Sequence, residues 1–255
     1  MCNGKGDKPI RILDLFSGIG GFSLGLKWAG GFKTVAYCEI DPYCQEVLQA
    51  RMRDGSLDTA PICTDITKLD GRPWRGRVDL ICGGFPCQDI SNQGLRAGIE
   101  GKRSGLWSEF SRLLREIRPR FAIVENVAAL LSRGMGVVLW DLADIGFNAE
   151  WRVLPACGFG APHCRERVWI VAHPYRKRLL KWSGNPARQG TVEVQRRTEQ
   201  FEGLLQAAAR TGVPSRSGRG VHDGIPKRVD RLRAIGNSIV PSVAEWIGRK
   251  ITESL

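Results

Sequence analysis

The stretch GGFPCQDIS, residues 83–91, directly follows the apolar run VDLIC, residues 78–82. An apolar strand that ends in two glycines and a proline predicts that Cys87 lies on an irregular loop at the carboxyl edge of a sheet, where open α/β sheets bind ligands. The thiolate is the reactive form of cysteine, and such a loop can present it to a substrate. A buried structural cysteine is the alternative, because free cysteine is often buried, and Cys82 fits that description. For Cys87 we favour a nucleophile.

Strand and helix patterns alternate on both sides of this loop. An apolar strand at 11–16 leads through the glycine-rich turn 17–21 into an amphipathic helix. A second strand at 34–40 precedes a helix with Asp41 as its N-cap and Pro42 at its first position. This alternation predicts an α/β fold. Further strands are expected at 61–66, 121–127, 147–155 and 168–172, and further helices at 105–117, 137–145 and 241–251.

Composition narrows the class of protein. A chain of 255 residues has room for one α/β domain with a full core and a small insertion. The net charge of +12, from 38 Lys and Arg against 26 Asp and Glu, favours a polyanionic partner such as nucleic acid. The sequence has neither a long apolar span nor a signal peptide, so we expect a cytoplasmic protein without a membrane partner. Eight cysteines contain no C-x-x-C pair, so we expect no metal site and no disulfide framework.

The composition changes at His173. Residues 173–224 carry ten Lys and Arg against four Asp and Glu, and this difference of six is half of the chain's net charge of +12. Gly, Ser, Pro and Gln interrupt any helical or strand period there. We therefore divide the chain into an α/β domain at 1–172, a basic region at 173–224 and a return to the α/β domain at 225–255. A solvated, disordered linker is the alternative for the basic region.

Charged side chains occur where expected strands begin or end. Glu39 ends the second strand, where such folds place an acid that binds ribose hydroxyls, and Asp65 ends the third. Glu125 ends an otherwise apolar run, where an ionised carboxylate is costly to bury unless it is paired or protonated. Arg165 and Arg167 alternate at a strand entrance, so both guanidinium groups lie on one face and suit an anion or a carbonyl oxygen. For the acids, the alternative is a strand end that simply reaches solvent. For the two arginines, it is a solvated charge pair.

Five motifs occur in an order that resembles the DNA cytosine-5 methyltransferase family. They are DLFSGxGG at 14–21, GFPCQ at 84–88, ENV at 125–127, RER at 165–167 and GNS at 236–238. The resemblance spans the chain outside 173–224, and the short basic region is similar to that of phage- or prophage-borne members. It implies a Rossmann-like, S-adenosylmethionine-dependent methyltransferase sheet with mostly parallel strands, an antiparallel hairpin at one edge and a small basic insertion. It also implies a monomer in the nucleoid of a bacterial or phage-infected cell.

The resemblance implies a reaction on double-stranded DNA. Cys87 would add to C6 of a flipped-out cytosine, so that C5 can take a methyl group from S-adenosylmethionine. Glu125 would hydrogen-bond the base, which requires a protonated or shared carboxyl. Arg167 would meet the cytosine O2, with Arg165 bracing the same loop. Asn126 would hold the loop.

The same resemblance implies a cofactor site built from several strand ends. Phe16 would lie against the adenine, and Glu39 would bind the ribose. Ile40 stands where the family often has a large aromatic residue, which weakens adenine stacking. The remaining cofactor residues implied by the motifs are Gly18, Gly20, Gly21, Asp65, Ile66, Pro86, Asn237 and Ser238.

The basic region would be the target-recognition region, with Arg196, Arg197, Arg216 and Arg219 as DNA contacts. One alternative is a cytosine-5 methyltransferase acting on tRNA, but that relative usually carries a Cys-Phe-Thr signature there and residues 173–224 contain no cysteine. Another is a catalytically inactive DNA-binding relative, although decay would be expected to change Cys87 or Glu125 first. A nicotinamide-dependent oxidoreductase is disfavoured because Ser23 interrupts the G-x-G-x-x-G pattern.

Overall fold

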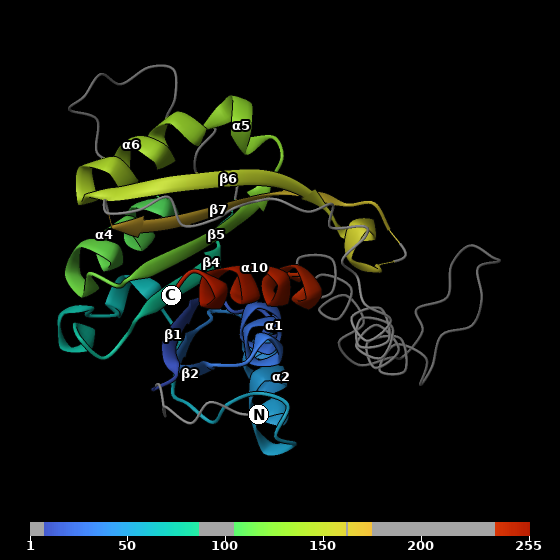
Figure 1. Cartoon of the computed structure of the whole chain (residues 1–255). Coiled ribbons are helices and arrows are strands. Elements are labelled where there is room, and N and C mark those ends of the chain that lie inside the picture. Colours follow the sequence, from blue (N-terminus) through green and yellow to red (C-terminus); the bar gives the residue numbers. More distant parts are fainter. Residues whose placement is uncertain (1–7, 87–104, 162, 175–237) are drawn as a thin grey trace, which may run out of the picture.

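A seven-stranded sheet forms the centre of the computed structural model, which describes residues 8–86, 105–161, 163–174 and 238–255 (Figure 1). The strand order is β3-β2-β1-β4-β5-β7-β6. The strands from β3 to β5 are parallel, and β7 runs antiparallel to both of its neighbours. The expected Rossmann-like sheet with an antiparallel hairpin at one edge is confirmed. Its strands are β1 (Ile10–Leu15), β2 (Phe32–Cys38), β3 (Ile62–Cys63), β4 (Leu80–Gly84), β5 (Phe121–Val127), β6 (Phe147–Pro155) and β7 (Glu166–Pro174).

Helices cover both faces of the sheet (Figure 1). Along β5, Ala122 and Val124 pack on the face covered by α4 and α6, whereas Phe121 and Ile123 pack on the face covered by α1 and α10. Successive strand residues point to opposite faces, so burial on both faces explains the continuous apolar run. The helices are α1 (Gly21–Ala29), α2 (Pro42–Arg53), α4 (Leu106–Ile117), α5 (Leu130–Arg133), α6 (Met135–Ile145) and α10 (Pro241–Glu253), with short 3₁₀ turns η1 (Ile66–Lys68), η2 (Arg72–Trp74) and η3 (Ala156–Phe159).

The last helix, α10, packs along the first, α1 (Figure 1). This close approach requires residues without side chains. A Cβ on Gly25 would collide with the carbonyl oxygen of Pro241, and a Cβ on Gly21 would lie 2.6 Å from the carbonyl oxygen of Ile239. The segment before α10 is therefore held against the glycine-rich turn that follows β1.

Some element boundaries differ from the sequence expectation for local reasons. The third strand ends at Cys63 rather than near residue 66, because Asp65 turns the chain by accepting a hydrogen bond from the Thr67 amide and capping η1. Asp41 caps α2 as expected, since its side chain accepts from the amides of Tyr43 and Cys44. Within the described ranges, no helix is long and apolar enough to cross a membrane.

Candidate active site

The turn after β1 is held in a constrained backbone conformation. Phe16 has a φ of 52°, in the left-handed region that costs a residue with a side chain about 1–3 kcal/mol. Gly18 and Gly20 also have positive φ, of 55° and 88°. The Ser17 hydroxyl donates to the carbonyl oxygen of Asp14 at 2.6 Å and accepts from the Cys38 amide at 3.2 Å, which ties this turn to the end of β2. The turn is therefore rigidly placed at the carboxyl edge of the two strands.

Glu39, just after β2, connects that turn to the next helix. Its carboxylate is only 8% exposed and accepts two backbone hydrogen bonds, from Gly18 at 2.6 Å and from Asp41 at 2.8 Å. The sequence predicted Glu39 at the site. It did not predict these two hydrogen bonds, because they join residues that only the fold brings together. Glu39 thus positions the glycine turn as well as presenting a carboxylate at the sheet edge.

Three other expected cofactor residues flank Glu39. Ile40 is 74% exposed, while Ile66 is buried in the core. The amide of Glu39 donates to the carbonyl oxygen of Cys63 at 2.9 Å, so the ends of β2 and β3 lie together. Hydrogen bonds from Thr67, aided by Lys68, hold the pKa of Asp65 below its ordinary value. The structure therefore brings an exposed apolar side chain and two acids to one edge of the sheet.

Glu125 ends β5 inside the protein. Its side chain lies 3.0 Å from the guanidinium of Arg167, measured from Oε1 to Nε, and the residue is 7% exposed. Burial raises the pKa of Glu125 to about 7, although the positive charges of Arg167 and Arg165 oppose that rise. Gly84 pairs with Glu125 across β4 and β5, and a Cβ there would lie 2.7 Å from Glu125 Oε2. Gly84 therefore leaves the space that this carboxyl occupies.

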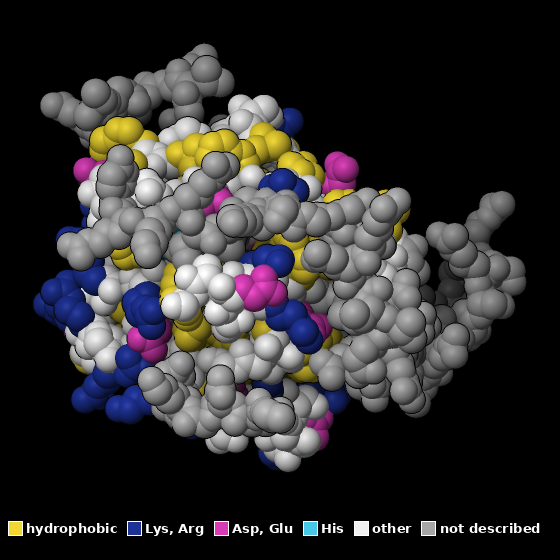
Figure 2. Space-filling model, viewed as in Figure 1, with side chains coloured by type: hydrophobic (Ala, Val, Ile, Leu, Met, Phe, Trp, Pro, Cys, Tyr) yellow, Lys and Arg dark blue, Asp and Glu magenta, His cyan; other side chains and the backbone are white. Residues whose placement is uncertain are grey.

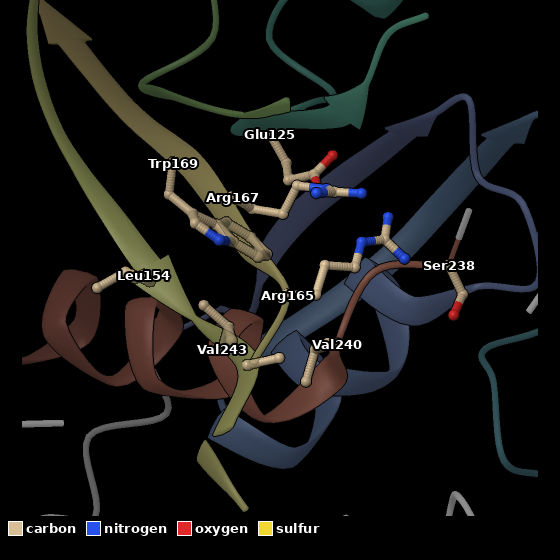
Figure 3. Close-up of a pocket in the computed structure, with 9 residues that line it drawn as sticks. Glu125, Leu154, Arg165, Arg167, Trp169, Ser238, Val240 and Val243 are labelled. Carbon is tan, nitrogen blue, oxygen red and sulfur yellow. The ribbon is translucent and has the colours of Figure 1, made fainter. Parts of the chain in front are cut away.

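A small hollow, open to solvent, lies beside this carboxyl (Figure 3). Figure 3 shows the guanidinium groups of Arg165 and Arg167 extending to the same side, with the Glu125 carboxylate close to Arg167. Burial lowers the pKa of Arg165, with the charge of Arg167 adding to the effect. Ser238 lines this hollow as well. The complete lining is Glu125, Leu154, Ala156, Arg165, Arg167, Trp169, Ser238, Val240 and Val243.

Asn126 connects this hollow to the GGFPC stretch. Its side-chain amide donates to the carbonyl oxygen of Phe85 at 2.9 Å, and its Oδ1 accepts from the Val127 amide at 2.8 Å. The resemblance implies that Asn126 holds the loop, and this bond ties its side chain to the backbone just before that loop. Pro86, the last described residue before the gap at 87–104, is exposed. The expected site residues Cys87, Asn237, Arg196, Arg197, Arg216 and Arg219 lie outside the described residues.

Two features near the site were not anticipated. Asp14, the last residue but one of β1, is fully buried and accepts from the Ser23 hydroxyl at 2.6 Å, and burial raises its pKa to about 7. The expectation of no disulfide was wrong, because Cys157 and Cys164 are bonded with their Cα atoms 4.7 Å apart. The connection between two antiparallel strands brings these cysteines together, so spacing along the sequence did not reveal them. Among the described residues, no cluster of three or more His, Cys, Asp or Glu side chains could hold a metal ion.

Comparison with known proteins decides the family. Residues 10–211 match the family model described as C-5 cytosine-specific DNA methylase. The chain belongs to this family. It is 37% identical over 166 residues to the Type II methyltransferase M.Eco47II of Escherichia coli, covering 63% of this chain and 39% of that protein. It is 31% identical over 216 residues to the orphan methyltransferase M.SPRI of Bacillus phage SPR, covering 78% of this chain and 48% of that protein. The chain thus spans less than half the length of these two relatives.

Solved structures agree with the fold of this member of the C-5 cytosine-specific DNA methylase family. A putative DNA modification methyltransferase encoded within an E. coli prophage aligns over 96% of this chain and 99% of its own, with a TM-score of 0.65 and 18% identity. A Spodoptera frugiperda DNMT2 mutant aligns over 68% of this chain and 52% of its own, with a TM-score of 0.55 and 22% identity. At these identities the likeness concerns the fold alone.

Proposed function

We propose that this chain transfers a methyl group from S-adenosylmethionine to C5 of a flipped-out cytosine in double-stranded DNA. The observation that carries the proposal is the buried Glu125 carboxyl, whose pKa is raised to about 7 beside Arg165 and Arg167. An acid that holds its proton near neutral pH can donate a hydrogen bond to a base nitrogen. In a C-5 cytosine-specific DNA methylase, this arrangement fits recognition of the cytosine ring.

Glu125 and the two arginines recognise the edge of the base. The protonated carboxyl donates to cytosine N3, and its other oxygen accepts from the exocyclic N4 amine. Arg167 donates to the O2 carbonyl, which develops negative charge when a nucleophile adds to the ring, and Arg165 braces the same loop. The base enters as a flipped nucleotide, since these atoms are inaccessible inside a stacked duplex.

Cys87 acts as the nucleophile. Its thiolate forms a bond to C6, and the electron pair of the C5–C6 double bond becomes available at C5 for the new methyl group. The C5 proton is then removed, the double bond re-forms and the bond from sulfur to C6 breaks. The contact between Asn126 and the carbonyl of Phe85 supports this role, because it fixes the chain two residues before the nucleophile.

The residues present fit the cofactor that this reaction needs. S-adenosylmethionine, when bound, supplies the methyl group from its sulfonium. The glycine turn at the N-terminus of α1 offers backbone amides for a carboxylate. Glu39 accepts from the ribose hydroxyls, while Phe16 and Ile40 flank the adenine. The adenine side of this site is completed by Asp65, Ile66 and Pro86. Its methionine side is formed by Gly18, Gly20, Gly21, Asn237 and Ser238.

The basic region holds the DNA. Arg196, Arg197, Arg216 and Arg219 neutralise phosphates, which positions the duplex without specifying a sequence. The net charge of +12 supports a polyanionic substrate.

The proposal is tested by bisulfite sequencing of total DNA from cells that express the chain. We expect protected cytosines within one short recurring sequence, and none in cells expressing Cys87→Ser. Purified chain, incubated with a radiolabelled methyl donor, should label duplex DNA in preference to tRNA. Label in tRNA alone would favour the RNA methyltransferase alternative, and label in neither would overturn the proposal.

A further inference from the structure

The disulfide between Cys157 and Cys164 closes the connection from β6 to β7, next to the hollow beside Glu125. Ala156 directly precedes the first cysteine and Arg165 directly follows the second, and both residues line that hollow. The Ala156 amide donates to the carbonyl oxygen of Arg165 at 2.9 Å. The disulfide is therefore adjacent to one of the two arginines that the site presents.

The first arm of this connection is anchored in the core. Ala156 is buried, and Phe159 of η3 packs edge-to-face on Trp246 of α10 with their ring centroids 5.8 Å apart. Figure 1 shows η3 at the end of the β6–β7 hairpin, near α10. The disulfide joins Cys164 of the second arm to this anchored arm. It therefore limits how far Arg165, the next residue, can move.

Arg165 also lies where strands open most readily. The last residue pair of β6 and β7 is Pro155 with Glu166. The bond between Ala156 and Arg165 comes just after this pair, at the end of the ladder. Strand ends open locally at a smaller free energy than strand centres, and a covalent link between the two arms opposes that opening. Reduction of the disulfide should therefore let this end open and move Arg165 away from Glu125.

This disulfide is accessible to small molecules. Both of its cysteines are exposed, whereas the free cysteines Cys38, Cys44 and Cys82 are buried. Exposed disulfides are more readily reduced than buried ones. The chain carries a net charge of +12, and Figure 2 shows Lys and Arg side chains over more of the viewed face than Asp and Glu. A basic surface attracts an anionic thiol such as glutathione more strongly than a cationic one.

We propose that Cys157 and Cys164 form a thiol–disulfide exchange site for small anionic thiols, and that its state sets how firmly Arg165 is held beside Glu125. The thiolate of one small thiol bonds to Sγ of Cys157 while the Cys157–Cys164 bond breaks and Cys164 leaves as a thiolate. A second small thiol then bonds to the first and releases Cys157. Two electrons and two protons pass to the protein, and two small thiols become one small disulfide. The effect of this exchange on methyl transfer rests on the proposed function.

Amide hydrogen exchange at Ala156 tests the opening without any activity. The full chain is held in either oxidised or reduced glutathione, and exchange is followed by NMR. Reduction should speed exchange at Ala156 by about tenfold or more, whereas Ile170, at the centre of β7, should not respond. Cys157→Ala combined with Cys164→Ala should show the fast rate at Ala156 in both mixtures.

The same two states test the effect on the site. The positive charge of Arg165 lowers the pKa of Glu125, so reduction should raise that pKa, and the double variant should show the raised value in both mixtures. Reduced chain should also methylate duplex DNA several-fold more slowly than oxidised chain, although a reductant protects the thiol of Cys87. At equal thiolate concentration, cationic cysteamine should reduce the disulfide more slowly than glutathione.

Each part of the proposal has an outcome that overturns it. The exchange site is overturned by free thiols at both positions in oxidised glutathione, or by an Ala156 amide that does not respond to reduction. Faster amide exchange with an unchanged pKa of Glu125 overturns the link to Arg165, and equal rates with glutathione and cysteamine overturn the preference for anionic thiols. Equal methyl transfer in the two states overturns the effect on the reaction. Absence of methyl transfer from every form, while amide exchange and the pKa of Glu125 respond as expected, contradicts the proposed function and not the exchange site.

Discussion

Glu125→Gln should remove a pH-dependent part of the protein's stability. Burial raises the pKa of Glu125 from its ordinary 4.5 to about 7, so the folded chain holds a proton that the unfolded chain has lost. Each pKa unit corresponds to about 1.4 kcal/mol, so the ionised carboxyl costs the folded state about 3 kcal/mol above neutral pH. This contribution to stability is fully present below pH 4.5 and is lost as the pH rises through 7.

Denaturant unfolding of the wild type and of Glu125→Gln between about pH 5 and pH 8 measures this effect. The free energy of unfolding of the wild type, relative to the variant, should fall by about 2–3 kcal/mol across this range, because glutamine does not titrate. Asp14→Asn is a matched control, since burial also raises the pKa of Asp14 to about 7 and this variant keeps the Glu125 contribution. A difference between wild type and Glu125→Gln that does not vary with pH would refute the raised pKa.

Three further predictions follow from the site. Glu39→Ala removes two backbone hydrogen bonds to a buried carboxylate, so it should lower the free energy of unfolding by about 1.5–3 kcal/mol per bond. The same change should raise the Kd for S-adenosylmethionine. Unchanged values in thermal unfolding and calorimetric titration would contradict this. Gly84→Ala would place a Cβ 2.7 Å from the carboxylate of Glu125 and should sharply reduce methyl transfer. Gly136→Ala is the control and should not reduce it, because the space around Gly136 is open. Equal rates of methyl transfer for the two variants would argue against this crowding. Reversal of Arg196 and Arg197 to Glu should weaken DNA binding and flatten the plot of log K against log salt; an unaltered slope would assign the pair to a solvated linker.

The sequence predicted those parts of the fold that depend on local pattern. The run Phe121–Val127 is apolar on both faces because helices cover both faces of the sheet, and its length matches β5. Glu39 and Glu125 were found as candidates because each ends an apolar strand, and the carboxyl ends of parallel strands share one edge. Asp41 was found as a cap because its side chain bonds amides within the next turn.

Contacts between distant parts of the chain could not be predicted in this way. The bond from the Gly18 amide to Glu39 joins two strand ends, and its existence depends on the register of β1 and β2. The burial of Asp14 depends on Ser23 reaching it from α1. Gly84 was expected at the end of its strand, but only the structure shows that it leaves space for a carboxyl from the neighbouring strand. Such pairings require the folded geometry.

The central claim, nucleophilic attack by Cys87 on cytosine in DNA, is tested most directly by mechanism-based trapping. Duplex DNA in which 5-fluorocytosine replaces cytosine throughout contains every target sequence, and fluorine at C5 cannot leave as a proton after methyl transfer. With S-adenosylmethionine present, the wild-type chain should form a denaturant-resistant complex with this DNA, and peptide mass analysis should place the bond on Cys87. Cys87→Ser should form none, because a hydroxyl lacks the acidity and nucleophilicity of the thiol. An adduct on another cysteine, or no adduct while unmodified duplex DNA is methylated, would contradict the account.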